Sequence, residues 1–237
     1  MTQEIIDKAI ELWQDDAEKE AIQLLDESID LEKNAEANTL IGQMYIGAER
    51  GVSNIKKDVK KGIQFLQKGL NLGDAEAGIE LADLYYLGEG VKENYKKAEK
   101  YWIASWELGE ERAGFELANF YYDELNEKIN EAINIYEQLI DRNEFVGNCN
   151  SKLSKIYEKG IGGIIPNLDK SLMYLEEGAK DSHIHCCMNL GLKYYRGDGV
   201  KRDIVKAIEL VEKVKDNELF KKEVEVLLNK MIKEEKI

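Results

Sequence analysis

The chain has 237 residues, of which 43% are hydrophobic and 34% are charged. This apolar content suffices for a packed core and excludes wholesale disorder. No stretch approaches the roughly 20 apolar residues that a membrane span needs. Lys and Arg number 33 against 47 Asp and Glu, which gives a formal net charge of −14. A field of this sign repels nucleic-acid phosphates, so we expect no nucleic-acid ligand and a basic protein as partner.

The compartment is predicted from the amino terminus and from the cysteines. The first residues mix charges into an apolar stripe, unlike the charged-then-apolar plan of a secretory signal. Three cysteines, two of them adjacent, are too few and too poorly spaced for a disulfide framework. We therefore expect a soluble cytoplasmic protein without membrane association, and a monomer in preference to an oligomer.

Helices are predicted along nearly the whole chain. Apolar residues recur at helical spacing, as in Ala77, Leu81 and Leu84, and the single proline, Pro166, cannot punctuate many strands and turns. Alternating β-branched runs, which are typical of strands, are missing. The fold class is therefore all-α.

The two ends of the chain are predicted to cap a helical array. Residues 1–33 contain a helical hairpin, and residues 218–237 contain one amphipathic helix. The terminal units of a repeat array must cover an open apolar end and present a polar outer face. Docking of these segments on a membrane or on a partner helix is the alternative.

The middle of the chain, residues 34–217, contains five copies of one pattern. Each copy has a small residue, a large aliphatic residue four positions later, then a second small residue and a tyrosine three positions beyond it. The tyrosines are Tyr45, Tyr85, Tyr121, Tyr157 and Tyr194. These positions form one stripe of a helix, so each copy is expected to begin with a helix that buries this stripe.

A second helix is expected in each copy, marked by a small residue with a bulky one three positions later. The small residue allows two helices to approach closely. The pairs are Gly62 with Phe65, Ala98 with Tyr101, Ala132 with Ile135, Ser171 with Tyr174, and Ala207 with Leu210. Glycine-bearing turns join the two helices in four copies, at 47–51, 88–91, 160–163 and 197–200, whereas the third copy has a shorter connector without glycine.

The pattern of small residue, Leu, Tyr, GxGV and Lys-Ala resembles the Sel-one-like repeat, a relative of the tetratricopeptide repeat. The clearest copy is AEAGIELADLYYLGEGVKENYKKAEKYW at 75–102, whereas the third copy is closer to a tetratricopeptide repeat. The resemblance implies a right-handed α-α superhelical solenoid with first helices on the concave side. It also implies that the protein binds other proteins.

Each first helix has a second stripe, which the repeat pattern does not assign to the core. The resemblance implies that this stripe lines the concave groove. We expect it to contact the partner through Thr39, Gln43, Ile79, Asp83, Tyr86, Phe115, Asn119, Tyr122, Ser151, Lys155, Met188, Leu192 and Tyr195. The aromatic members suit interface anchors, although packing against neighbouring repeats is the alternative for them. Lys155 is the only basic residue of these, so no basic cluster able to hold a peptide carboxylate is expected.

Negative charge is concentrated in two segments. Residues 1–33 carry 11 acidic and 3 basic side chains, and residues 110–147 carry 10 and 3. Asp123 and Glu124 are the acidic residues that we expect to dock a basic protein. A merely solvated face is the alternative.

The sequence HIHCC at 183–187 offers ligand types that zinc prefers, but its spacing on a helix is poor. Cys186 occupies the slot that holds Ala37, Ala77 and Ala113 in other copies, and Cys149 occupies it in the fourth, so both are expected to be small core residues. We expect no metal and no cofactor.

No spacing nominates catalytic residues, and the function predicted is therefore non-enzymatic protein binding. The most specific form of this hypothesis is a cytoplasmic acidic inhibitor, of the immunity-protein type, that binds and neutralises a basic toxin or effector. A general regulatory adaptor or scaffold is one alternative. A hydrolase or metal-dependent enzyme with its site in the groove is the other.

Overall fold

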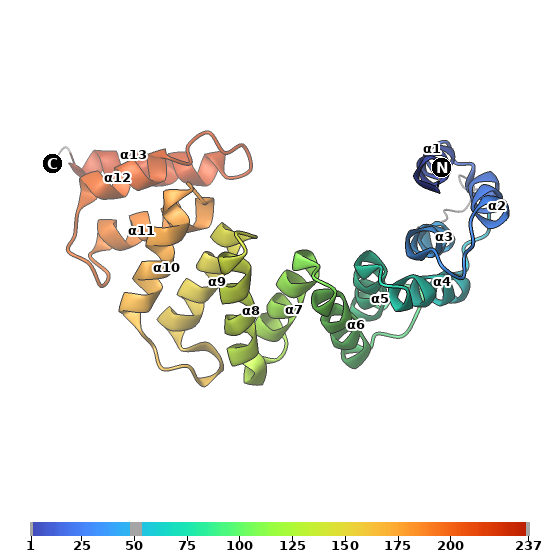
Figure 1. Ribbon diagram of the computed structural model, residues 1–237. Coiled ribbons are helices and arrows are strands. Elements are labelled where there is room, and N and C mark those ends of the chain that lie inside the picture. Colours follow the sequence, from blue (N-terminus) through green and yellow to red (C-terminus); the bar gives the residue numbers. More distant parts are fainter. Residues whose placement is uncertain (1, 48–53, 236–237) are drawn as a thin grey trace. The chain divides into compact units, whose positions relative to one another are not determined.

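The computed structural model describes residues 2–47 and 54–235. Thirteen α-helices and two short 3-10 turns follow one another in these ranges, which contain no β-strand (Figure 1). The all-α prediction is confirmed. No helix in the same ranges is long and apolar enough to cross a membrane. The turn expected at 47–51 lies outside the described residues except for Gly47.

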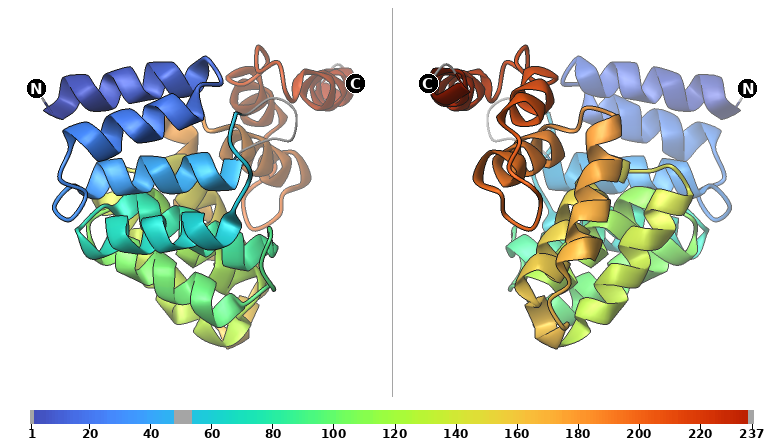
Figure 2. Two further views of the ribbon diagram at one scale, coloured as in Figure 1. Left: turned by 90° about the vertical axis from the view of Figure 1, so that its right-hand side faces the viewer. Right: turned by 90° about the vertical axis from the view of Figure 1, so that its left-hand side faces the viewer.

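The chain divides into two compact units, residues 1–117 and 118–237. In unit 1 each helix packs against the next in chain order (Figure 2, blue to green). Its helices are α1 (Thr2–Gln14), α2 (Glu18–Ser28), α3 (Ala35–Gly47), α4 (Val59–Asn71), α5 (Ala75–Leu87) and α6 (Tyr95–Glu107), followed by the start of α7 (Glu111–Asp123).

Unit 2 is built in the same way from the end of α7 onward. From α8 each α-helix again packs against the one that follows it (Figure 2, yellow to red). The elements are η1 (Asn126–Lys128), α8 (Ile129–Asp141), α9 (Val146–Lys159), η2 (Ile161–Gly163), α10 (Leu168–Lys180), α11 (Ile184–Arg196), α12 (Ile204–Glu212) and α13 (Lys221–Glu235).

The terminal helices contribute apolar side chains to the cores of the adjoining repeat helices. Ile6 and Ala9 of α1 and Leu25 of α2 are fully buried in one cluster with Ile41 of α3. In unit 2, Val224 and Met231 are buried in the cluster that includes residues of α11 and α12. Each terminal segment therefore shares a core with the repeat helices next to it.

One set of contacts joins the two helices of a repeat, and we call it the Tyr–cap–Lys joint. In the copy built by α5 and α6, the Asn94 backbone N–H donates to the Tyr85 carbonyl at 2.7 Å. The Asn94 side chain accepts from the Lys97 backbone N–H at 3.1 Å and so caps α6. The Lys97 ammonium then donates to the Tyr85 hydroxyl at 3.1 Å and lies 4.3 Å from the centre of its ring.

The same joint occurs in three further copies with the same atoms in the same roles. Its members there are Tyr45, Asp58 and Lys61; Tyr157, Asn167 and Lys170; and Tyr194, Asp203 and Lys206. The third copy departs from it, because α8 begins after Lys128 without a side-chain cap. The Lys128 ammonium still lies 4.9 Å from the Tyr121 ring.

Small residues bring the paired helices together where the sequence predicts them. Ala98, Ala132, Ser171 and Ala207 are fully buried. A Cβ atom added to Gly62 would lie 2.5 Å from Cγ1 of Ile46, closer than real side-chain atoms approach. The small slots are therefore points of helix contact, as expected.

Removing one cap should weaken this construction measurably. Asn94→Ala deletes the acceptor of the Lys97 N–H, so we expect the free energy of unfolding to fall by about 1 kcal/mol. Urea denaturation followed by circular dichroism measures this change, with the exposed Lys96→Ala on the same helix as control. Equal stability of the two variants would show that the side-chain cap of the joint contributes nothing.

Candidate functional site

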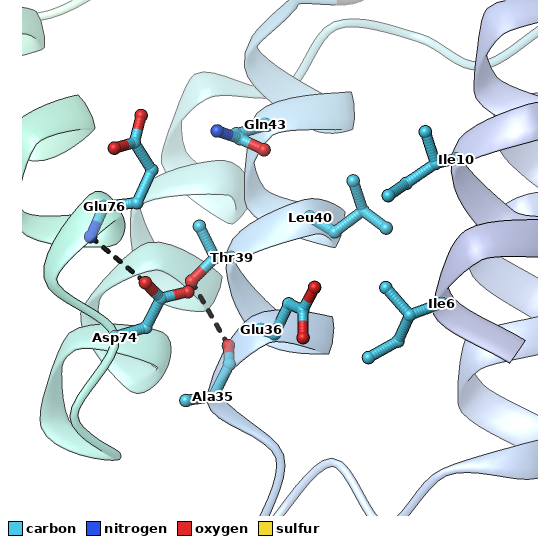
Figure 3. Close-up of a pocket in the computed structure, with 9 residues that line it drawn as sticks. All are labelled: Ile6, Ile10, Ala35, Glu36, Thr39, Leu40, Gln43, Asp74 and Glu76. Carbon is cyan, nitrogen blue, oxygen red and sulfur yellow. Dashed lines mark hydrogen bonds between the residues drawn. The ribbon is translucent and has the colours of Figure 1, made fainter. Parts of the chain in front are cut away.

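A pocket of about 520 Å³ opens in unit 1 among α1, α3 and the start of α5 (Figure 3). Three kinds of side chain line it. They are the apolar Ile6, Ile10, Ala35 and Leu40, the polar Thr39 and Gln43, and the acidic Glu36, Asp74 and Glu76. In Figure 3 Leu40 of α3 points toward Ile6 and Ile10 of α1, while Asp74 and Glu76 lie on the opposite side. The pocket therefore has an apolar wall facing an acidic one.

Local hydrogen bonds hold the polar lining in place. The Asp74 carboxylate caps α5 by accepting from the Glu76 backbone N–H at 3.1 Å. The Thr39 hydroxyl donates to the Ala35 carbonyl at 3.2 Å, and the Gln43 amide donates to Glu80 at 3.1 Å. Asp74 is thus partly used by the helix terminus and Glu76 by Arg112, which leaves Glu36 as the carboxylate with most capacity for a ligand.

An arginine lies within the acidic surface next to this pocket. Nη1 of Arg112 lies 3.4 Å from Glu76, and Nη2 lies 3.9 Å from Asp83. Burial raises the pKa of Glu76, and the positive charge of Arg112 opposes that shift. Burial raises the pKa of Asp83 to about 6, an effect that Arg112 opposes and that Glu116 and Glu80 reinforce. Carboxylates therefore outnumber the one cation here, and the region stays negative.

A smaller pocket of about 240 Å³ lies in unit 2 between α9 and α11. It is lined by Lys155, Glu158, Lys159, Asn189, Leu192, Lys193, Arg196 and Asp198. Lys155 is the only basic residue of the predicted stripe, but the expectation that no basic cluster forms is wrong, because the structure places three further cations around the same cavity. Lys193 lies outside the predicted stripe, on the buried side of α11. Lys159 and Arg196 follow the stripe one turn later, and extending the stripe by four residues would have found them.

Four residues of the predicted binding stripe offer almost no surface. Thr39, Ile79, Ser151 and Tyr195 are buried, with Ile79 only 1% exposed. Tyr195 is covered by α13, and its hydroxyl donates to Glu234 of that helix. We therefore remove Ile79, Ser151 and Tyr195 from the surface available to a partner, whereas Thr39 reaches it only as part of the pocket lining. Gln43, Asp83, Lys155, Met188 and Leu192 remain partly exposed.

The aromatic members of the stripe are engaged within the fold. Tyr86 packs against Tyr95 and Trp102, with ring centres 5.6 and 5.4 Å apart. Because Trp102 is buried, loss of Tyr86 would disturb the core, so this residue is a poor probe of binding. Phe115 and Tyr122 are half-buried. Tyr86 therefore packs within the fold, which was the alternative to its role as an interface anchor.

The predicted acidic docking residues lie at the end of α7. Asp123 and Glu124 are exposed, but Asp123 forms an ion pair with Lys152 at 3.4 Å. The Lys152 ammonium also lies 4.2 Å from the centre of the Tyr122 ring. Asn119, on the same helix, accepts from the Tyr136 hydroxyl at 2.8 Å. Asp123 is thus partly neutralised within unit 2 and is a weaker docking group than expected.

The HIHCC segment serves the core. Cys149 and Cys186 are fully buried, as predicted for the small slot. The Cys186 thiol donates to the Gly147 carbonyl, whereas the Cys187 thiol donates to the Ala179 carbonyl. Burial raises the pKa of Cys186 to about 12, so this thiol stays protonated. Within the described ranges no three His, Cys, Asp or Glu side chains gather closely enough to hold a metal ion.

The fold and these sites define a class of stacked helix-turn-helix repeat proteins. The profile of the Sel1 repeat matches residues 35–74, 75–110, 148–183 and 184–214, which is more than half of the chain. The chain therefore belongs to the Sel1 repeat family, whose members are generally protein-interaction modules. The unmatched stretch between the second and third ranges is the copy that lacks the complete Tyr–cap–Lys joint.

Solved structures share the fold. A Sel1 repeat protein from Oxalobacter formigenes is similar with a TM-score of 0.71 and 21% identity, over 89% of this chain and 84% of that one. A protective antigen present in uropathogenic Escherichia coli strains, which displays the same fold, gives 0.67 and 22%, over 92% and 44% of the two chains. No curated protein matches the chain in sequence.

The raised pKa of Asp83 predicts a pH dependence of stability. The folded protein binds this proton more tightly than the unfolded chain, whose carboxyl has a pKa of 3.8. The stability that the folded protein gains from this proton is therefore complete below pH 3.8, and it is lost as the pH rises through about 6. Asparagine does not ionise, so Asp83→Asn avoids this fall in stability. We therefore expect the variant to gain stability relative to the wild type between about pH 4 and pH 7.

Thermal melts across this pH range measure the difference, and exposed Glu107→Gln serves as the control. The gain should be small, because solvent screens a side chain that is 39% exposed. A constant difference between Asp83→Asn and wild type at every pH would contradict the raised pKa.

Proposed function

We propose that this protein is a non-enzymatic protein-binding module whose unit 1 pocket holds a basic segment of its partner. One observation carries the proposal, namely the pocket in which Ile6, Ile10 and Leu40 face Glu76, with Glu36 one turn from Leu40 on the same helix. An apolar wall beside carboxylates matches the two parts of a lysine or arginine side chain. The aliphatic stem packs on the wall and the charged head reaches the acids.

The charge of the chain supports the same partner. The net charge of −14, with 11 acidic against 3 basic residues in 1–33, surrounds the pocket's first helix with negative potential. Such a field accelerates encounter with a basic protein and slows encounter with an acidic one. Affinity would come from the pocket, and the association rate from the wider field.

The most specific role that we propose is that of an inhibitor, which sequesters and neutralises a basic toxin or effector in the manner of an immunity protein. Such a role needs only tight binding, and an acidic chain suits a basic target. A general adaptor would use the same pocket and differ in its partner. Binding without catalysis is proposed because Asp83, the carboxyl with a pKa of about 6, lies beside Arg112 and does not line the pocket.

Binding of a defined peptide tests the pocket directly. The probe is a fluorescent, C-terminally amidated peptide of alternating lysine and leucine, and a glutamine–leucine peptide of equal length is its control. We expect Glu36→Gln combined with Glu76→Gln to weaken binding of the lysine peptide about tenfold, as loss of charge-assisted hydrogen bonds does. Fluorescence anisotropy measures the affinity.

The matched control exchanges two exposed acids outside the pocket, Glu89→Gln with Glu107→Gln, and so changes the net charge equally. It should slow association without altering the dissociation rate. Equal affinity of both peptides for the wild type would contradict the proposal, and so would equal weakening by the two double variants. A basic toxin whose activity survives saturating amounts of the chain would exclude the inhibitor role for that toxin and leave the adaptor role.

A further inference from the structure

The unit 2 pocket between α9 and α11 differs in charge from the chain as a whole. Four cations and two carboxylates line it, although acids exceed bases across the sequence. Lys193 is buried and is bound to Glu158, so this pair forms part of the wall. In the part of the chain that the structure describes, Lys155, Lys159 and Arg196 form no ion pair. The cavity therefore carries positive charge that the fold itself does not neutralise.

Helix ends explain only part of this arrangement. Lys159 and Arg196 stand in the last turns of α9 and α11, where cations stabilise the helix dipole. That effect acts on each helix alone and does not require the two ends to share a cavity with Lys155. The Lys155 charge also extends beyond the pocket, since it adds to burial in lowering the pKa of His185. Stabilisation of the helix dipoles therefore does not explain why Lys155, Lys159 and Arg196 line one cavity.

We propose that this pocket binds a carboxylate of a protein ligand, either an acidic side chain or the terminal carboxylate. Ammonium and guanidinium groups form short, charge-assisted hydrogen bonds to a carboxylate. Leu192 and the stems of the cations give an apolar surface for the adjoining chain, and Asn189 adds an amide. The inference rests on the proposed protein-binding function but not on the unit 1 pocket.

The two pockets carry opposite charges at different ends of the first helices. Glu36 and Glu76 lie in the first turns of α3 and α5, whereas Lys159 and Arg196 lie in the last turns of α9 and α11. Gln43 in unit 1 and Lys155 in unit 2 hold the same slot of their first helices. The slot of Gln43 borders Glu36 and Glu76, whereas that of Lys155 borders Lys159 and Arg196. Unit 1 therefore selects basic groups and unit 2 selects acidic ones. A partner that presents both would be distinguished from one that is merely basic.

Three labelled peptides of equal length separate the sources of the carboxylate. The first carries glutamate side chains and an amidated end, the second has no acidic side chain but a free terminal carboxylate, and the third is uncharged with an amidated end. We expect the first or second to bind the full chain and the third not to bind. At about 0.15 M salt, screening over roughly 8 Å leaves the pocket's own cations dominant over distant acids.

Variants then assign the binding to this pocket. Lys155→Gln with Arg196→Gln should weaken binding of the peptide by about tenfold or more. The thermal midpoint should fall only slightly, because neither side chain forms an ion pair in the described structure and Arg196 acts only on the α11 dipole. The matched control, Lys180→Gln with Lys215→Gln, removes two exposed cations of unit 2 outside the pocket and should alter affinity less than about twofold.

The outcome separates this site from the one in unit 1. Glu36→Gln with Glu76→Gln should leave carboxylate-peptide affinity unchanged, and a loss there would overturn the assignment to unit 2. Failure of both carboxylate peptides to bind would also overturn it, whether or not the chain binds inorganic phosphate. Binding of the lysine peptide to unit 1 decides the proposed function independently.

Discussion

The Tyr–cap–Lys joint is the contact set on which the repeats depend. Two helices joined by a turn have many possible crossing angles, and each repeat must adopt nearly the same one for the stack to continue. The joint reduces that choice, because one residue such as Asn94 binds the end of the first helix through its backbone and the start of the second through its side chain. Gly88, with a φ of +71°, ends the first helix so that the chain can turn back.

Because the joint and the small slots determine the packing, the remaining face of each first helix is free to vary in charge. Unit 1 uses that freedom to place Glu36 and Glu76 beside an apolar wall. Unit 2 uses it to bring Lys155 and Arg196 to one cavity. The same backbone thus supports pockets of opposite charge, and we propose that specificity depends on these few side chains at the surface.

Much of the fold could be predicted from the sequence, because the repeat pattern reports local packing five times over. Ala98 and Cys186 were expected in the core from their slots, and both are buried. The sites were less accessible to sequence reasoning. Tyr195 occupies a groove position in the pattern, but α13, which lies far along the chain, covers it. Lys193 stands where the equivalent residue of the previous copy is the buried Ile156, and only the structure shows its pairing with Glu158.

We propose that a basic segment of the partner occupies the unit 1 pocket. Hydrogen–deuterium exchange of the full chain, with and without the lysine–leucine peptide, locates the bound peptide, because exchange reports protection segment by segment. We expect slower exchange in α1, α3 and the first turn of α5, with α2 and α4 unchanged. Protection confined to α2, α4 and α6, or no protection in unit 1 at peptide saturation, would contradict it.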